Sequence, residues 1–448
     1  WNKVPKQIIT LPGTITTEKF GASVSIWGNR MVVGDSGSKK VYVFFRDTEN
    51  DDWCSVMNAH RIADHINVPD FGAHVKMKNG TIVVSGDNNL FVFQPIVYDT
   101  ITVASPLWSG TGGLLEALTA SVPSGKERQI VLDFGAASAT AVVVQDTRTG
   151  EYGPGRGICT AHDGIPARLT VIGIPHLGQR PILSGGDATR IFFIYEDATG
   201  SGMGGELTLK HLELRNGIVS IGANPGGGAA IYAASGSRLW LFDLIFVDNV
   251  QSDPGTTNHY GGGAVSLGLE NTALHGGADA VIKSCVFENN TAKFGGALFV
   301  SGTGSSAVIT DSNFTGNLAT THGGSFTIRG ATSVLSCARC IVEGNSAKGS
   351  GNGVGGGLYA VSSIVSLVDS TFTKNEADRP NGQEGGAMYL HGPLQFSMAG
   401  SVSTEGRIDG ENNPTRFVNL VDWETAALSV PGVTQSNVMR CEDRPKIC

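Results

Sequence analysis

Two short stretches decide the fold of this chain: Gly296-Ala297-Leu298-Phe299-Val300 and, a little further on, Phe314-Thr315-Gly316-Asn317. The first is a glycine and a small residue followed by a strand in which Leu298 and Val300 alternate with Phe299. Apolar side chains at every second position are the pattern of a strand with one buried face. Both stretches have several copies between residues 207 and 395, so internal repetition has to be resolved before any local motif.

The two signatures alternate along this region in units of about thirty residues. The small residue of the first signature falls at Ala230, Ala264, Ala297, Ser325, Gly357 and Ala387, with steps of 34, 33, 28, 32 and 30 residues. The aromatic or apolar residue of the second falls at Phe246, Phe287, Phe314, Val342 and Phe372, each three places before an asparagine. Short strands and glycine turns without helical periodicity predict coils of a parallel β-solenoid, stacked ~4.8 Å apart. A propeller blade would need four strands over ~40–50 residues, which is longer than these units.

The first hundred residues carry a different repeat. Phe20-Gly-Ala-Ser-Val-Ser-Ile-Trp-Gly-Asn-Arg-Met-Val-Val-Gly-Asp35 is matched, 51 residues later, by a stretch that runs from Phe71-Gly-Ala-His-Val to Ile82-Val-Val-Ser-Gly-Asp87. Val41-Tyr-Val-Phe44 and Leu90-Phe-Val-Phe93 follow the two copies. Each copy predicts three strands joined by tight turns.

Both repeats resemble known families. The alternation of Gly-Gly-Ala-apolar with Phe-x-x-Asn resembles the repeat of the chlamydial polymorphic outer membrane proteins and of similar extracellular proteins of bacteria, algae and other protists. That resemblance implies surface exposure and adhesive or structural work, and it implies no catalytic residues. The N-terminal copies resemble FG-GAP repeats, the blade unit of integrin-α-like propellers. The calcium loop of that family, Asp-x-Asp-x-Asp-Gly, is not reproduced, because Asp47-Thr-Glu-Asn-Asp-Asp52 has another spacing and lacks the glycine.

Composition bounds the possible partners. The 32 Lys+Arg against 40 Asp+Glu give a net charge of −8, which argues against a nucleic-acid partner. No apolar run of about 18 residues occurs, so no transmembrane segment is predicted. The 62 glycines and 40% hydrophobic residues fit a folded, turn-rich chain with a large core. No motif predicts a metal or another cofactor.

Cysteines and sequons point to an extracellular location. Asn-x-Ser/Thr sequons begin at Asn79, Asn289 and Asn313, and we expect glycans there. Cys441 and Cys448 enclose a short polar loop and are predicted to form a disulfide. Cys337 and Cys340 occupy columns that are otherwise apolar or small, so they are core residues or a local disulfide. The pairing of Cys54, Cys159 and Cys285 stays open, and because there are seven cysteines at least one is unpaired within the chain.

An enzyme is the main rival hypothesis, because β-helix lyases and hydrolases carry carboxylates on one face. Three residues before each aromatic of the second signature stands an outward column of mixed charge: Asp243, Ser284, Asp311, Arg339 and Asp369. Asp311 and Asp369 would lie two coils apart with Arg339 between them. An inverting hydrolase needs its carboxyls ~6.5–9.5 Å apart, so spacing alone does not exclude catalysis. An arginine between them would hold both ionised, however, which leaves no general acid.

The sequence therefore predicts an all-β chain with an FG-GAP-like β module at 1–100, a right-handed parallel β-helix at 101–400 with strict repeats at 207–395, and a C-terminal cap with a cysteine pair at 401–448. The predicted function is a non-enzymatic, secreted structural or adhesive protein of a cell-surface layer, appendage or filament. Its expected partners are proteins or further copies, bound at the solenoid ends or faces, with glycans as another candidate. The alternatives are a polysaccharide lyase or hydrolase that uses Asp311, Asp369 and Arg339, and a ligand-binding fragment of a larger surface receptor.

Overall fold

The computed structural model has two compact units, Trp1–Val97 and Tyr98–Cys448, each described here by itself. The described residues are 19–37, 39–46, 60–64, 68–79, 81–93, 98–124, 126–145, 157–160, 165–194, 205–220, 227–252, 261–268, 277–330, 332–349, 353–378, 386–391, 395–399, 401–404 and 408–411. Cys54, Cys441, Cys448, the acidic stretch 47–52 and most of the expected C-terminal cap lie outside them.

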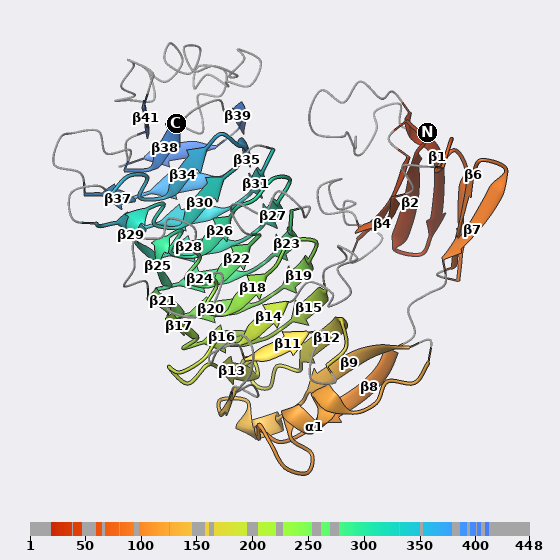
Figure 1. Cartoon of the computed structure of the whole chain (residues 1–448), viewed down its shortest axis with the longest axis horizontal. Coiled ribbons are helices and arrows are strands. Elements are labelled where there is room, and N and C mark those ends of the chain that lie inside the picture. The colour runs from red at the N-terminus through yellow and green to blue at the C-terminus, as the bar shows by residue number, and fades with distance from the viewer. Residues whose placement is uncertain are drawn as a thin grey trace. The chain divides into compact units, whose positions relative to one another are not determined.

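The larger unit is a stack of coils, and each complete coil contributes one strand to each of four parallel sheets (Figure 1). The first sheet contains β8 (Tyr98–Val103), β9 (Glu127–Leu132), β12 (Arg168–Gly173), β15 (Glu206–Lys210), β19 (Arg238–Phe242), β23 (Asp279–Lys283), β27 (Ser306–Thr310), β31 (Val334–Ala338), β35 (Ile364–Val368) and β39 (Gln395–Ala399). The second contains β10 (Ala141–Val143), β13 (Ile182–Ser184), β16 (Glu213–Arg215), β20 (Ile245–Val247), β24 (Val286–Glu288), β28 (Asn313–Thr315), β32 (Ile341–Glu343), β36 (Thr371–Thr373) and β40 (Val402–Thr404).

The two remaining sheets complete each turn of the chain. The third contains β17 (Ile218–Ser220), β21 (Val250–Ser252), β25 (Thr291–Phe294), β29 (Leu318–His322), β33 (Ser346–Ala347) and β37 (Glu376–Ala377). The fourth contains β11 (Ile158–Thr160), β14 (Phe192–Ile194), β18 (Ile231–Ala233), β22 (Val265–Leu267), β26 (Leu298–Val300), β30 (Phe326–Arg329), β34 (Leu358–Val361), β38 (Met388–His391) and β41 (Ile408–Glu411). These stacked parallel sheets confirm the predicted parallel β-solenoid.

The strand register confirms that residues about thirty apart in sequence are stacked. Leu298 pairs with Phe326, and Phe326 pairs with Leu358, so the three lie in one file of the fourth sheet. All three are buried in a single continuous core. The aromatic residues of the second signature form a corresponding file in the second sheet. Within it the Phe246 and Phe287 rings stack with centroids 4.5 Å apart and an interplanar angle of 9°.

The asparagine of the second signature forms a buried ladder from coil to coil, through Asn249, Asn290, Asn317, Asn345 and Asn375. The Asn317 side-chain amide donates to the backbone carbonyl of Phe287 (3.0 Å) and to Oδ1 of Asn345 (2.9 Å). Its own Oδ1 accepts from the backbone N–H of Asn290 and from the Asn290 amide, both at 3.0 Å. Each amide thus has its hydrogen bonds satisfied inside an apolar core, and the ladder holds neighbouring coils in one register.

The glycine pair before β26 of the fourth sheet is a steric requirement. Gly295 has a φ of 60°, and a Cβ there would lie 2.3 Å from the carbonyl oxygen of Leu298. At Gly296 a Cβ would lie 2.2 Å from the carbonyl oxygen of Gly324 in the next coil. The chain turns sharply and contacts its neighbour closely at the same place, so only glycine fits both positions.

A short helix at the N-terminal end of the solenoid packs onto its core. The stretch Leu114-Leu-Glu-Ala-Leu forms helix α1 (Leu114–Thr119), and its buried side chains join the core. The fully buried Arg128 of β9 donates to the carbonyls of Ala117 (2.7 Å), Ala120 (2.9 Å) and Ser121 (3.0 Å). These carbonyls at the end of the helix lack intrahelical partners, so a buried cation is well placed there.

The smaller unit consists of two antiparallel sheets. Sheet A contains β1 (Phe20–Trp27), β2 (Arg30–Asp35), β3 (Lys40–Phe45) and β4 (His60–Asp64), and sheet B contains β5 (Val75–Lys78), β6 (Thr81–Gly86) and β7 (Asn89–Phe93). The three strands predicted for each N-terminal copy are thereby confirmed. One face of sheet A and one face of sheet B share a core that includes Val32, Val41, Val75 and Met77.

Replacing Asn317 by alanine tests the asparagine ladder. Asn317→Ala removes two donors and an acceptor that neighbouring buried groups need, so we expect a loss of ~2–4 kcal/mol in the free energy of unfolding. Asn313→Ala, on the exposed face of β28, is the matched control and should change it by no more than ~0.5 kcal/mol in unglycosylated protein. Urea denaturation measures both variants. Equal effects would mean that the ladder does not stabilise the stack.

Candidate functional site

The outward charged column lies at the turn between the first and second sheets. Its residues share a left-handed backbone, with φ of 52° at Asp243, 55° at Ser284, 52° at Asp311, 54° at Arg339 and 47° at Asp369. Such turns favour short polar side chains, which explains the aspartates and the serine; the larger Arg339 departs from this pattern. The same geometry repeats in successive coils, so the column is first of all a consequence of how the chain turns.

Within this column Asp311 and Arg339 form a two-pronged ion pair. Nε of Arg339 donates to Oδ1 of Asp311 at 2.6 Å, and an η nitrogen donates to Oδ2 at 2.9 Å. The hydrogen bond to Asp311 is the main cause that raises the pKa of Arg339, and the charge of Asp369 adds to it. The structure therefore brings together all three residues of the enzyme hypothesis.

The Asp311–Arg339 pair is bidentate and open to solvent. Both oxygens of Asp311 accept hydrogen bonds from the Arg339 guanidinium. The side chains of Asp311 and Arg339 are 37% and 57% exposed, so water is not excluded from the pair. Exposed ion pairs of this kind contribute ~1 kcal/mol or less to stability.

A second charged cluster lies in the same column, at a coil nearer the N-terminal end. Asp243 accepts from Arg180 at 2.5 Å through one carboxylate oxygen, and its other oxygen is 2.8 Å from Nδ1 of His211. Partial burial alone would raise the pKa of Asp243, but the hydrogen bonds with His211 and Arg180 together outweigh burial and lower it. Arg180 precedes β13, before the strict repeats begin, so no repeat pattern in the sequence could have indicated its part in this cluster.

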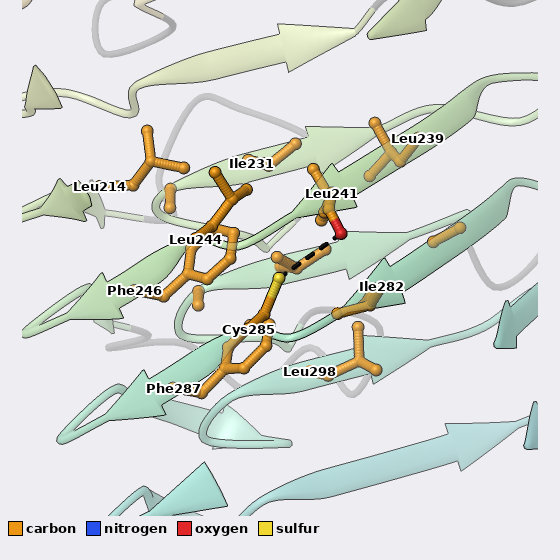
Figure 2. Close-up of a cluster of buried hydrophobic side chains, with 14 of the residues drawn as sticks. Leu214, Ile231, Leu239, Leu241, Leu244, Phe246, Ile282, Cys285, Phe287 and Leu298 are labelled. Atoms are coloured by element: carbon orange, nitrogen blue, oxygen red, sulfur yellow. Dashed lines mark hydrogen bonds between the residues drawn. The ribbon is translucent and has the colours of Figure 1, made fainter. Parts of the chain in front are cut away.

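The cysteines of the solenoid lie inside the core. Cys285 is buried between Phe246, Phe287 and Ile282 (Figure 2), and its thiol donates to the carbonyl oxygens of Lys283 (3.3 Å) and Leu241 (3.5 Å). Burial is the main cause that raises the pKa of Cys285 to about 12. A thiol with so high a pKa is neutral at physiological pH and unreactive.

The disulfide considered for Cys337 and Cys340 is not formed, because both residues are buried thiols in the structure. Cys337 belongs to the file of Ile309 and Leu367 on the first sheet, whereas Cys340 follows the left-handed Arg339. The Cys340 thiol contacts the backbone carbonyls of Ala338 and Ile309 at 3.8 and 3.9 Å. Burial, followed by a hydrogen bond with Cys340, raises the pKa of Cys337. Both residues therefore act as core side chains.

All three predicted glycosylation sites are exposed. Asn79 lies in the turn between β5 and β6, Asn289 follows β24, and Asn313 opens β28. Asn289 stands next to Asn290, which is fully buried in the asparagine ladder, so the sequon falls on the one of the two asparagines that faces solvent.

Neither a metal centre nor a membrane-spanning helix is found in the part of the chain that is described. No group of three His, Cys, Asp or Glu side chains there is placed to hold a metal ion. No helix among the same residues is both long and apolar enough to cross a bilayer. No protein-family model matches the chain, and neither does any curated protein sequence or solved structure.

Burial of the thiols predicts that they react slowly with alkylating reagents in the folded protein. Because burial raises the pKa of Cys285 and of Cys337, we expect neither to react with iodoacetamide in folded protein at about pH 8, and both to react once guanidinium unfolds the chain. Peptide mass spectrometry of the alkylated protein measures this. Rapid labelling of either cysteine in the folded state would contradict the core assignment.

The hydrogen bonds of Asp243 predict that its contribution to the free energy of unfolding depends on pH. A carboxyl whose pKa is lowered on folding stabilises the protein above its unfolded pKa of ~4, and that stabilisation is lost as the pH falls through the folded pKa. Wild type should therefore be more stable than Asp243→Asn at about pH 7, and the difference should shrink below pH ~4. Urea denaturation of both proteins at several pH values measures it, and a difference independent of pH would contradict the assignment.

Proposed function

We propose that this chain is a non-enzymatic, extracellular structural or adhesive protein, a component of a cell-surface layer, appendage or filament. The observation that carries the proposal is the unbroken parallel stack, in which apolar, aromatic and asparagine files run from coil to coil. Such a stack is stiff along its axis and presents equivalent outward positions at regular intervals. That geometry is typical of surfaces that bind extended partners or further copies.

The side-chain chemistry supports the same proposal. The asparagines are the recurring polar side chains of the core, and they form hydrogen bonds between neighbouring coils. The outward column at the turn pairs its arginine with Asp311, and Asp243 with Arg180 and His211. A charged column of that kind suits recognition of polar partners better than proton transfer.

Secretion and glycosylation belong to this proposal. Asn79, Asn289 and Asn313 are exposed, so glycans on them are compatible with the fold. Comparing the intact mass of the native protein before and after enzymatic deglycosylation tests it. The resemblance to surface-protein repeats and to FG-GAP repeats supports the same location. The disulfide predicted between Cys441 and Cys448, which lie outside the described residues, would fit it as well.

Electron microscopy and binding assays test the proposed role directly. Native material should contain the protein in layers, appendages or filaments, or purified protein should bind to cells or to extracellular matrix. Dispersed particles that bind neither would overturn the proposal.

The polysaccharide lyase or hydrolase remains the second candidate, because the structure does bring Asp311, Arg339 and Asp369 together. We expect no activity on a panel of acidic and neutral algal and plant polysaccharides. Glycan cleavage that is abolished by Asp311→Asn and Asp369→Asn, but kept in Asp248→Asn at a neighbouring turn, would establish the enzyme instead. Product analysis by mass spectrometry gives the readout.

A further inference from the structure

The sequon at Asn313 lies on a strand, with its asparagine and its threonine on the outer face. Strand β28 consists of Asn313, Phe314 and Thr315, and successive side chains of a strand point to opposite faces. Phe314 is fully buried in the core, whereas Asn313 and Thr315 are exposed. The two residues that define the sequon therefore face solvent together, and a glycan on Asn313 can leave the stack without disturbing the core.

Asn313 interrupts a short apolar file on the outer face of the second sheet. The strand register places Val286 of β24 beside it in the preceding coil and Ile341 of β32 beside it in the following coil. Ile245 of β20 pairs with Val286, and β20, β24 and β28 follow one another in the stack (Figure 1). Ile341 is 46% exposed, and Val286 and Ile245 are half-buried. Solvent-accessible apolar side chains thus flank Asn313 on both sides along the stack.

A glycan on Asn313 has to begin close to these neighbours. Val286 and Ile341 each lie about one strand spacing, ~4.8 Å, from Asn313. The first sugar of an N-linked glycan is bound directly to the side-chain amide nitrogen. Sugar rings have C–H groups on their faces and hydroxyls at their rims, so they can cover apolar side chains while the hydroxyls remain hydrogen-bonded to water.

We propose that Asn313 carries an N-linked glycan whose first sugars pack over Ile341 and Val286 and cover this apolar file. The chain's own glycan is the favoured occupant because its attachment residue lies within the file. The inference rests on the secretion that belongs to the proposed function, and it adds a contact surface for one particular glycan.

The attachment is a group transfer from a polyprenyl-pyrophosphate-linked oligosaccharide, the donor class used during secretion. A bond forms between Nδ2 of Asn313 and the anomeric carbon of the first sugar. The bond between that carbon and the phosphate oxygen breaks, the lipid pyrophosphate leaves, and the amide loses one proton. The product is a secondary amide that keeps one N–H donor and no charge.

The sequon at Asn289 lacks apolar neighbours of this kind. Asn289 lies in the turn after β24, and its counterparts in the preceding and following coils are Asp248 and Gly316. All three have a left-handed backbone, with φ of 54°, 53° and 65° respectively. A Cβ on Gly316 would lie 2.8 Å from Oδ1 of Asn289, so the glycine leaves room for the asparagine side chain. A glycan on Asn289 begins between an acidic residue and a glycine, which makes it the matched control.

The covered file restricts where other proteins can bind. A hydrated glycan in the middle of the second sheet keeps a protein partner from packing closely against that face. The contacts of a structural or adhesive protein therefore have to use other faces of the solenoid.

Hydroxyl-radical footprinting of the full chain, secreted from a eukaryotic host that adds N-glycans, tests the proposal, because the rate at which each side chain is oxidised reports its access to solvent. Thr315→Val removes the sequon but keeps Asn313 and a β-branched residue on the strand. We expect the oxidation rate of Ile341 in this variant to be at least double that of wild type. Thr315→Ser keeps the sequon and should match wild type. Mass spectrometry of peptides gives both the rates and the glycan occupancy.

Two further controls identify the cover as the glycan on Asn313. Thr291→Val removes the sequon of Asn289 and should leave the oxidation of Ile341 unchanged. Leu177, which is 90% exposed in a turn of an N-terminal coil, should be oxidised equally in every protein. Enzymatic deglycosylation of folded wild type should raise the oxidation of Ile341 as Thr315→Val does, and this comparison needs no variant to fold.

Three results would overturn the proposal. Unmodified Asn313 in the native protein means that no glycan is present at the file. A glycan on Asn313 whose removal leaves the oxidation of Ile341 unchanged projects into solvent. An equal rise in Thr291→Val assigns the cover to Asn289. Absence of glycans from all three sequons would also contradict secretion in the proposed function, whereas glycans at Asn79 and Asn289 alone would leave that function intact.

Discussion

The solenoid depends on keeping every coil in one register with its neighbours, and the buried asparagine ladder imposes that register. An amide inside an apolar core is tolerated only when its donors and acceptor are all bound. Asn317 meets this condition through Asn290 on one side and Asn345 on the other. A slip of one residue would break these bonds and turn the strand side chains to the opposite face. The ladder thus adds specificity to a core whose main stabilisation is apolar burial, including the stacked rings of Phe246 and Phe287.

The interior of the solenoid is filled by side chains that recur from coil to coil. The cysteines follow this rule: Cys285, Cys337 and Cys340 take places in apolar or small-residue files and remain buried thiols. Outward positions are not bound by the core and can vary from coil to coil. At the turn between the first two sheets, the left-handed backbone selects short polar residues, and Asp311 and Asp243 then acquire cationic partners. The result is a charged column on the outside of the stack.

The two units differ in how their repeats pack. Within the solenoid each coil covers the previous one, and at the N-terminal end helix α1 packs onto the core while Arg128 donates to the carbonyls at the helix end. The N-terminal unit repeats a sheet only twice, so the contact between its sheets is made once, through the core that includes Val32, Val41, Val75 and Met77.

The sequence alone determined the features that recur. The file of Leu298, Phe326 and Leu358 and the three strands of each N-terminal copy were predicted, because equivalent positions in a stack meet each other and must satisfy the same packing rule in every coil. Tertiary structure decided what does not recur. Helix α1 with Arg128, the cluster of Arg180 and His211 around Asp243, and the thiol state of Cys337 and Cys340 depend on contacts between non-equivalent positions. Contacts between non-equivalent positions produce no repeating pattern in a single sequence. They can be recognised only once folding has brought those residues together.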